Sequence, residues 1–187
     1  MQYIENLKSK VSLIKVIICL ALFITALFII NGETIGVAKL VKITGGVSIL
    51  DFEKGYTVER AYDILNRMGA EGRAYYLKYI IPMDFVFPFT YMLFYASTMI
   101  YLLKITPEPN RWLNYVPLVP IMNMLLDYTE NALIICMLTS YPQQLPGIVK
   151  AASVFTNLKL NFISMNAAII SAMIIFYVAK RFFMVKK

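Results

Sequence analysis

Three carboxylates lie inside long apolar runs of this chain of 187 residues: Asp84, Asp127 and Glu130. A carboxylate within the hydrocarbon of a bilayer costs roughly 2.5–3.5 kcal/mol on insertion scales, so such residues face other protein groups and mark functional sites. Carboxylate oxygens suit Mg²⁺, Mn²⁺ or Ca²⁺, and intramembrane acids also carry protons or cations. These acids are therefore the first candidates for chemistry.

Other polar side chains accompany each acid at helical spacing. One run carries Asn123, Asp127, Glu130 and Asn131. A second run carries Asp84, Pro88, Tyr91, Tyr95 and Thr98. A third run carries Asn157, Asn161 and Ser164, with Lys159 one step round the helix. Because residues three or four apart share a helix face, we expect three helices to form one polar seam.

The seam predicts a polar site and a set of partners for its acids. The predicted site residues are Asp84, Tyr91, Asp127, Glu130 and Asn131. The possible partners of the acids are Arg73, Lys159 and Asn161. If Lys159 or Arg73 neutralises an acid, the cluster is structural and leaves no site. No cofactor is expected; under the metal alternative, the ligands of Mg²⁺, Mn²⁺ or Ca²⁺ are Asp84, Asp127 and Glu130.

The composition indicates a membrane protein. Hydrophobic residues make up 59% of the chain and charged residues 16%, against roughly 25% charged in an average soluble domain. The sequence contains no histidine, which excludes imidazole base catalysis and histidine-ligated metals.

The apolar runs predict an all-α fold with four transmembrane helices, at about 11–31, 79–104, 113–138 and 148–182, since a span needs about 20 residues. We expect one membrane domain over residues 1–187. A cleaved signal peptide is the alternative for the first run, but no small-residue cleavage site follows it. Pro82 and Pro88 are expected to kink the second span.

Residues 32–72 form the only long polar stretch and predict a small extramembrane cap. Residues 36–46 predict a short strand or an interfacial turn. Residues 57–68 predict a helix that Thr57 caps and Gly69 ends, with its apolar residues on one face.

The net charge of +7 is concentrated near the chain ends. Lys and Arg slightly favour the side of the termini, so both termini are expected in the cytoplasm of a multi-pass cell-membrane protein. The basic residues flank apolar segments, which indicates contact with lipid headgroups and no nucleic-acid partner. Another membrane protein or a second copy of the chain is a possible partner.

Two segments resemble a pattern of small bacterial four-span membrane proteins. They are GRAYYLKYIIPMDFVFPFTY (72–91) and LLDYTENALI (125–134), preceded by LDFEKGYTVERAYDIL. The resemblance covers about residues 50–135. It implies the fold and supports the choice of Arg73, Asp84, Tyr91, Asp127 and Glu130, but it implies no activity.

Three function classes stay open from the sequence. The first is an accessory, sensor or immunity-type interaction protein whose cap meets a partner, and the small chain without a nucleotide motif favours it. The second is a proton- or cation-coupled transporter or channel subunit. The third is a carboxylate–metal enzyme that acts on a lipid-like substrate, although no nucleophile–base pair is visible.

Overall fold

The computed structural model describes residues 2–106 and 111–185 and is helical throughout these ranges, with no strand. Four of its helices are long and apolar enough to cross a membrane, over Leu13–Asn31, Gly69–Ile105, Trp112–Ser140 and Pro146–Phe182. The four predicted spans and the all-α membrane fold are therefore confirmed. The second of these helices begins at Gly69, ahead of the predicted span at 79–104, because it emerges from the cap as one continuous helix.

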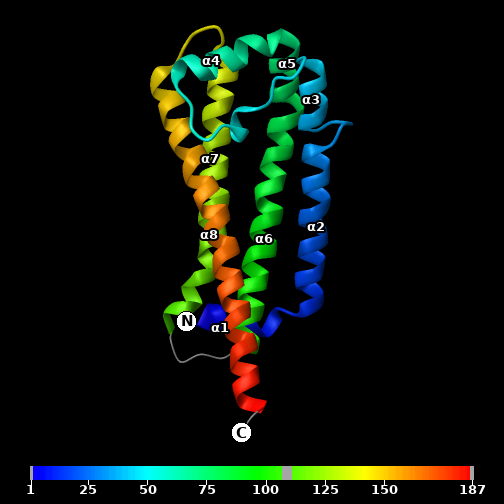
Figure 1. Ribbon diagram of the computed structural model, residues 1–187, viewed down its shortest axis with the longest axis vertical. Coiled ribbons are helices and arrows are strands. Elements are labelled where there is room, and N and C mark those ends of the chain that lie inside the picture. The colour runs from blue at the N-terminus through cyan, green and yellow to red at the C-terminus, as the bar shows by residue number, and fades with distance from the viewer. Residues whose placement is uncertain (1, 107–110, 186–187) are drawn as a thin grey trace.

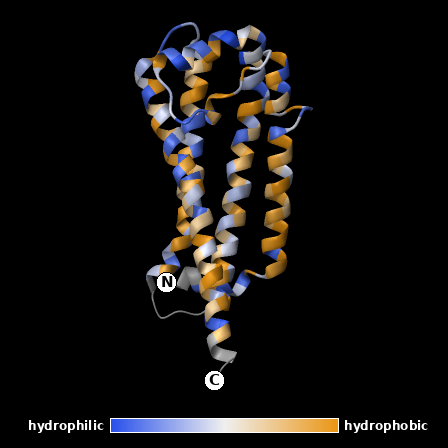
Figure 2. Cartoon of the chain, in the orientation of Figure 1, coloured by the Kyte–Doolittle hydropathy of each residue, from blue (hydrophilic) through white to orange (hydrophobic). Residues whose placement is uncertain are grey.

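The long helices are α2 (Leu13–Asn31), α6 (Ile81–Ile105), α7 (Val119–Ser140) and α8 (Pro146–Val185). Figure 1 shows α2 at one edge of the bundle beside α6, with α7 and α8 on the other side of α6. Phe23 of α2 stacks on Phe94 of α6 with ring centroids 5.7 Å apart. At the end of the bundle opposite the cap lie α1 (Gln2–Lys10) and η3 (Arg111–Leu118). The outer faces of α2 and α8 are largely apolar (Figure 2), as contact with lipid requires.

The helix that enters the membrane from the cap changes its winding before Pro82. α5 (Gly69–Tyr75) leads into a π-helical turn, η2 (Tyr76–Ile80), and then into α6. Proline has no N–H to donate and its ring crowds the preceding turn, and a widened turn is one way in which a helix absorbs such a disruption. The turn carries Tyr76, whose side chain is fully buried.

The cap consists of α3 (Val37–Ile43), η1 (Leu50–Phe52), α4 (Val58–Arg67) and the start of α5. The predicted strand or turn over 36–46 is wrong, because most of this segment forms α3. Val37 and Leu40 of α3 are buried; residues three apart share a helix face, so the helix can bury both on one side. The helix predicted at 57–68 is confirmed as α4, with the Thr57 side chain capping the Arg60 N–H.

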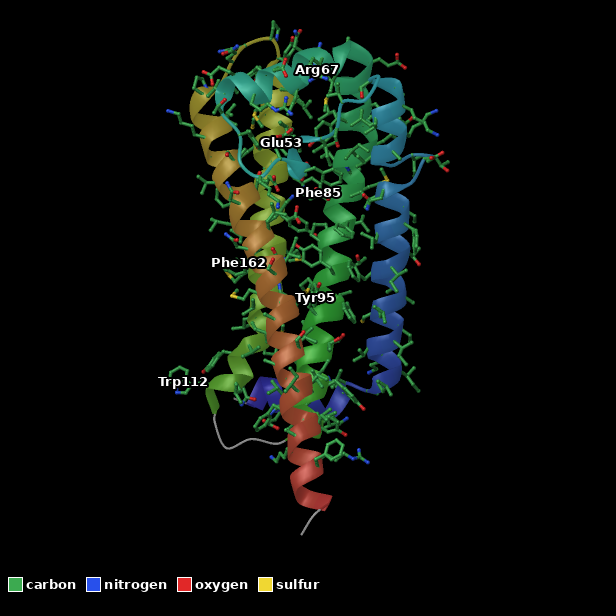
Figure 3. The ribbon with its side chains drawn as sticks, in the orientation of Figure 1. Glu53, Arg67, Phe85, Tyr95, Trp112 and Phe162 are labelled. Atoms are coloured by element: carbon green, nitrogen blue, oxygen red, sulfur yellow. The ribbon has the colours of Figure 1, made fainter. Side chains whose placement is uncertain are left out.

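One apolar core joins the cap to the membrane helices. Leu40, Leu50 and Leu65 of the cap are fully buried, and they belong to the same cluster as Ile134 of α7 and Val149 of α8. The side chains of Glu53 and Arg67 lie on the cap, far from Trp112 at the opposite end of the bundle (Figure 3). The cap thus rests directly on the ends of the membrane helices, where it can place a side chain between them.

Candidate functional site

A buried lysine forms the centre of the candidate site. Lys159 of α8 is 5% exposed. Its Nζ atom lies 2.7 Å from Oδ1 of Asp51 and 3.2 Å from Oδ1 of Asp127, and it also forms an ion pair with Oε2 of Glu130. Nζ donates hydrogen bonds to Asp51 and Asp127, whereas its contact with Glu130 is an ion pair.

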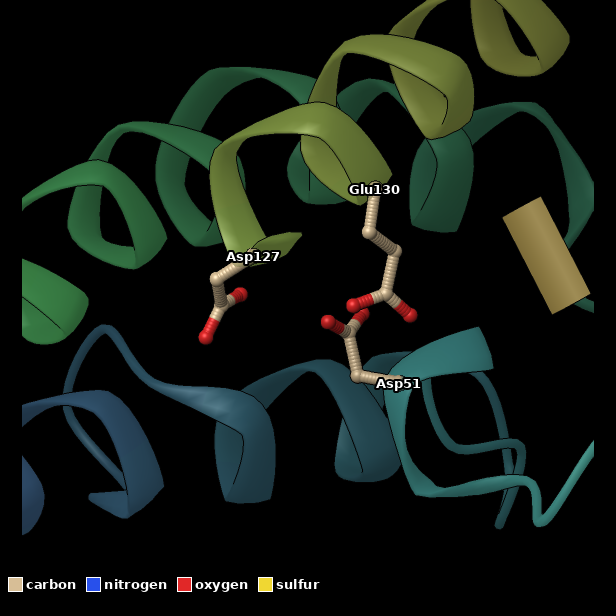
Figure 4. A group of neighbouring side chains, drawn as sticks. All are labelled: Asp51, Asp127 and Glu130. Atoms are coloured by element: carbon tan, nitrogen blue, oxygen red, sulfur yellow. The ribbon is translucent and has the colours of Figure 1, made fainter. Parts of the chain in front are cut away.

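The three carboxylates come from two distant segments of the chain. Asp127 and Glu130 project from α7, and Asp51 projects from η1 in the cap to meet them (Figure 4). The exposed fraction is 7% for Asp51, 2% for Asp127 and zero for Glu130. Together with Lys159 these residues form the ion cluster.

A hydroxyl group donates to the second oxygen of every carboxylate in the ion cluster. Tyr76 Oη donates to Oδ2 of Asp51 at 2.6 Å, and Tyr91 Oη donates to Oδ2 of Asp127 at 3.1 Å. Thr156 Oγ1 donates to Oε1 of Glu130. Each acid therefore contacts Lys159 through one oxygen and a hydroxyl through the other, which is the condition under which buried charges are tolerated.

The charges in the ion cluster do not balance by themselves. Three carboxylates face one ammonium, so the cluster is neutral only when two further positive charges, such as protons, are bound. Burial raises the pKa of Asp51, but attraction to Lys159 and hydrogen bonds from Lys159 and Tyr76 outweigh that effect and hold its pKa below the usual value.

Asp84 and Asn131 lie beside the ion cluster and link two helices. Nδ2 of Asn131 donates to the backbone carbonyl of Asp84 at 2.9 Å, which joins α7 to the first turn of α6. Asn131 is fully buried and Asp84 is 8% exposed. The carboxylate of Asp84 interacts electrostatically with Asp51, Asp127 and Lys159. Asp84 thus adds a fourth acid to the neighbourhood of a single lysine.

Arg73 and Asn161, two of the predicted partners, lie away from the acids. Nη1 of Arg73 donates to the carbonyl of Leu65 at 2.7 Å, and its guanidinium lies 3.8 Å from the ring centroid of Tyr141. The side chain of Asn161 is exposed on α8. Lys159 is the predicted partner that does reach the acids.

The face of α8 that points inward differs from the predicted stripe. The predicted residues Asn157, Asn161 and Ser164 are exposed. Among the α8 residues up to position 182, the buried ones are Val149, Ala152, Thr156, Lys159 and Asn166. The two sets lie on different faces of α8, and Val149 and Ala152 of the second set belong to the apolar core.

Three residues of the site were not predicted: Asp51, Tyr76 and Thr156. Asp51 follows the apolar residues Ile49 and Leu50, and an acid in such a position is a weak signal of burial. Tyr76 lies in the segment 72–91 that carries the resemblance to four-span membrane proteins, although the resemblance assigns it no role. Thr156 carries no signal in the sequence, because a threonine on an apolar helix is common.

The ion cluster also has the composition of a hard-cation site. One oxygen from each of Asp51, Asp127 and Glu130 lies within 4.8 Å of the others, and carboxylates are the usual ligands of Mg²⁺ and Ca²⁺. However, the ammonium of Lys159 contacts all three acids. The ammonium group of Lys159 therefore occupies the position among the three carboxylates that a metal ion would take.

Comparison of the chain with protein-family models, curated proteins and solved structures finds no match.

Proposed function

We propose that this multi-pass membrane protein is an interaction protein of the accessory or sensor type. In this proposal the cap presents the surface that meets a partner, and the ion cluster holds the cap in place on the membrane helices. Both termini lie in the cytoplasm and the cap lies on the other side of the membrane. The partner is another membrane protein or a second copy of the chain.

The contact between Asp51 and Lys159 carries this proposal. It joins the cap to the last membrane helix across 108 positions of the sequence. Asp51, Asp127 and Glu130 are each bound to Lys159 and to a hydroxyl group. Asp51 holds the cap against α8, and this role fits control of the position of the cap better than turnover of a substrate.

Phe52 supplies a surface that a partner could contact. It follows Asp51 directly in η1, yet its side chain is 59% exposed while that of Asp51 is buried. Because the two residues are adjacent in the chain, displacement of Asp51 would also displace the side chain of Phe52. Large aromatic side chains are frequent among the residues that contribute most to binding.

Ion coupling is the second candidate function, and the excess of acids favours it. Asp84, Asp127 and Glu130 lie in membrane helices near one lysine, and intramembrane acids often bind and release protons. Under this candidate the chain is a subunit of a transporter or channel, and the protonation of Asp127 changes during its cycle.

Photo-crosslinking from position 52 separates the candidates. A photoreactive phenylalanine replaces Phe52 in the full chain within its native membrane, with and without Asp51→Asn. An interaction protein gives one discrete adduct, and loss of the Asp51 contact weakens or removes it. If the adduct is absent or unchanged by Asp51→Asn, the proposal fails. Proton uptake into liposomes that is lost in Asp127→Asn would then favour ion coupling.

A further inference from the structure

The polar seam continues past the ion cluster, away from the cap. Asn123 lies four residues before Asp127 on the same face of α7 and is fully buried. Among the described residues, neither Oδ1 nor Nδ2 of Asn123 has a hydrogen-bond partner. Asn166 of α8 is also fully buried; its Nδ2 donates to the carbonyl of Phe162 at 2.9 Å, while no described group donates to its Oδ1.

The pairing of α7 with α8 brings these two amides to a similar depth. Asp127 contacts Lys159 and Glu130 contacts Thr156, so the two helices run antiparallel. At about 1.5 Å per residue, Asn123 lies about 6 Å beyond Asp127 and Asn166 about 10.5 Å beyond Lys159. The two amides are therefore about 4.5 Å apart along the bundle axis, on the buried faces of adjacent helices.

α6 places two tyrosines along this part of the polar seam and a buried apolar residue beyond them. Tyr91 of α6 donates to Asp127, and the ring of Tyr95 lies 6.3 Å from that of Tyr91. Tyr95 lies in the middle of the bundle, between the cap and the end that carries Trp112 (Figure 3). One turn further along α6, Met99 is fully buried. The polar region is thus bounded by apolar packing on the side away from the cap.

Buried amides without partners require an explanation. A buried polar group left without a hydrogen bond costs about 1–3 kcal/mol, whereas immobilising one bridging water costs about 0–2 kcal/mol. A ligand here has to accept from Nδ2 of Asn123 and donate to Oδ1 of Asn123 and Asn166. A metal cation cannot accept a hydrogen bond, but a water molecule meets both demands.

We infer that Asn123 and Asn166 form a hydration site beside Asp127 that holds ordered water inside the membrane part of the bundle. The water fills the hydrogen-bonding positions of both amides and gives Asp127 a polar neighbour on the side away from the cap. This inference stands apart from the proposed function, because it concerns the inner end of the seam and not the contact with the cap.

Radiolytic labelling tests the site in the full chain in lipid nanodiscs. X-rays convert bound water to hydroxyl radicals, which label side chains next to that water. Tyr91 and Tyr76 are both buried, with exposed fractions of 2% and zero, so Tyr76 serves as the internal reference. We expect Tyr91 to be labelled several-fold faster than Tyr76. Equal and slow labelling of both tyrosines would overturn the inference.

A leucine substitution gives an independent readout, because leucine branches at Cγ as asparagine does but has no hydrogen-bonding atoms. If water is present, Asn123→Leu and Asn166→Leu slow the labelling of Tyr91 and do not raise the melting temperature. Asn161→Leu, at an exposed position on α8, is the matched control and leaves the labelling unchanged. If the core is dry, Asn123→Leu removes an unsatisfied amide and raises the melting temperature, which would contradict the inference. Labelling of the wild-type chain decides the question even if a variant does not fold.

Discussion

The carboxylate of Asp51 and the ammonium of Lys159 are 108 positions apart in the chain, and their Oδ1 and Nζ atoms lie 2.7 Å apart. Both side chains are more than nine-tenths buried. This pair connects the extramembrane cap to the last membrane helix. The stability of the cap therefore depends on charges inside the bundle.

Asp51→Asn should loosen the cap more than it disturbs the membrane helices. The substitution removes a buried charge-assisted hydrogen bond, which is worth about 1.5–3 kcal/mol. Hydrogen–deuterium exchange should increase over residues 47–57 and stay unchanged in the middle of α7. Glu53→Gln is the control, because the partly exposed pair of Glu53 with Arg60 contributes only about 0–1 kcal/mol. Equal effects of the two substitutions would argue against a special role for Asp51.

Lys159→Met should destabilise the protein strongly. Removing one partner of a buried ion pair costs about 3–5 kcal/mol, because the remaining charges stay uncompensated. Unfolding titrations in detergent would measure the loss. Adding Asp127→Asn to Lys159→Met should restore part of the stability, since one of the unpaired acids is then neutral. A double variant less stable than Lys159→Met alone would contradict this account of the ion cluster.

Added divalent cations should raise the melting temperature of Lys159→Ala but not that of the wild type. Lys159 contacts all three acids in the wild type, so Ca²⁺ or Mg²⁺ should leave its melting temperature unchanged. In Lys159→Ala the same acids are free to bind a cation, and the melting temperature should rise with added Ca²⁺. If a chelator lowers the melting temperature of the wild type, the metal-enzyme alternative gains support.

Tyr76→Phe should cost more stability than Tyr91→Phe. The bond from Tyr76 to Asp51 is 2.6 Å long and holds the cap, whereas the bond from Tyr91 to Asp127 is 3.1 Å long. A hydrogen bond to a charged group contributes about 1.5–3 kcal/mol, and we expect Tyr76→Phe to approach the upper value. Chemical unfolding of both variants provides the comparison, with the loss of one hydroxyl as the common change.

Asp51 should make the stability of the protein depend on pH in the acid range. Its pKa is lower in the folded protein than its usual value, which is about 3.9 in an unfolded chain. The stability that Asp51 contributes is therefore complete above that value and is lost as the pH falls through the lower folded pKa. Unfolding free energies of the wild type and Asp51→Asn should converge as the pH falls below about 4. A constant difference between the two would show that Asp51 is not the group responsible.

The membrane helices were predictable because each requires only a long apolar run, whereas the ion cluster depends on contacts that no single run reveals. Asp127 and Glu130 were identified because acids are rare in such runs. Asp51 was missed, since its partner lies 108 positions away. The inward face of α8 was assigned to Asn157 and Asn161, because polar residues were assumed to cluster. Val149 and Ala152 are buried, and the inward face of α8 that they define also carries Lys159 and Thr156.

Lys159 is also the last member of the ion cluster to be synthesised. While the ribosome completes α8, Asp84, Asp127 and Glu130 have already emerged on two earlier helices without a counter-ion. Each such acid costs roughly 2.5–3.5 kcal/mol in the bilayer, so the hairpin of α6 and α7 is poorly suited to lipid on its own. We therefore expect the α6–α7 hairpin to become stable in lipid only once α8 brings the ammonium group of Lys159 to these acids.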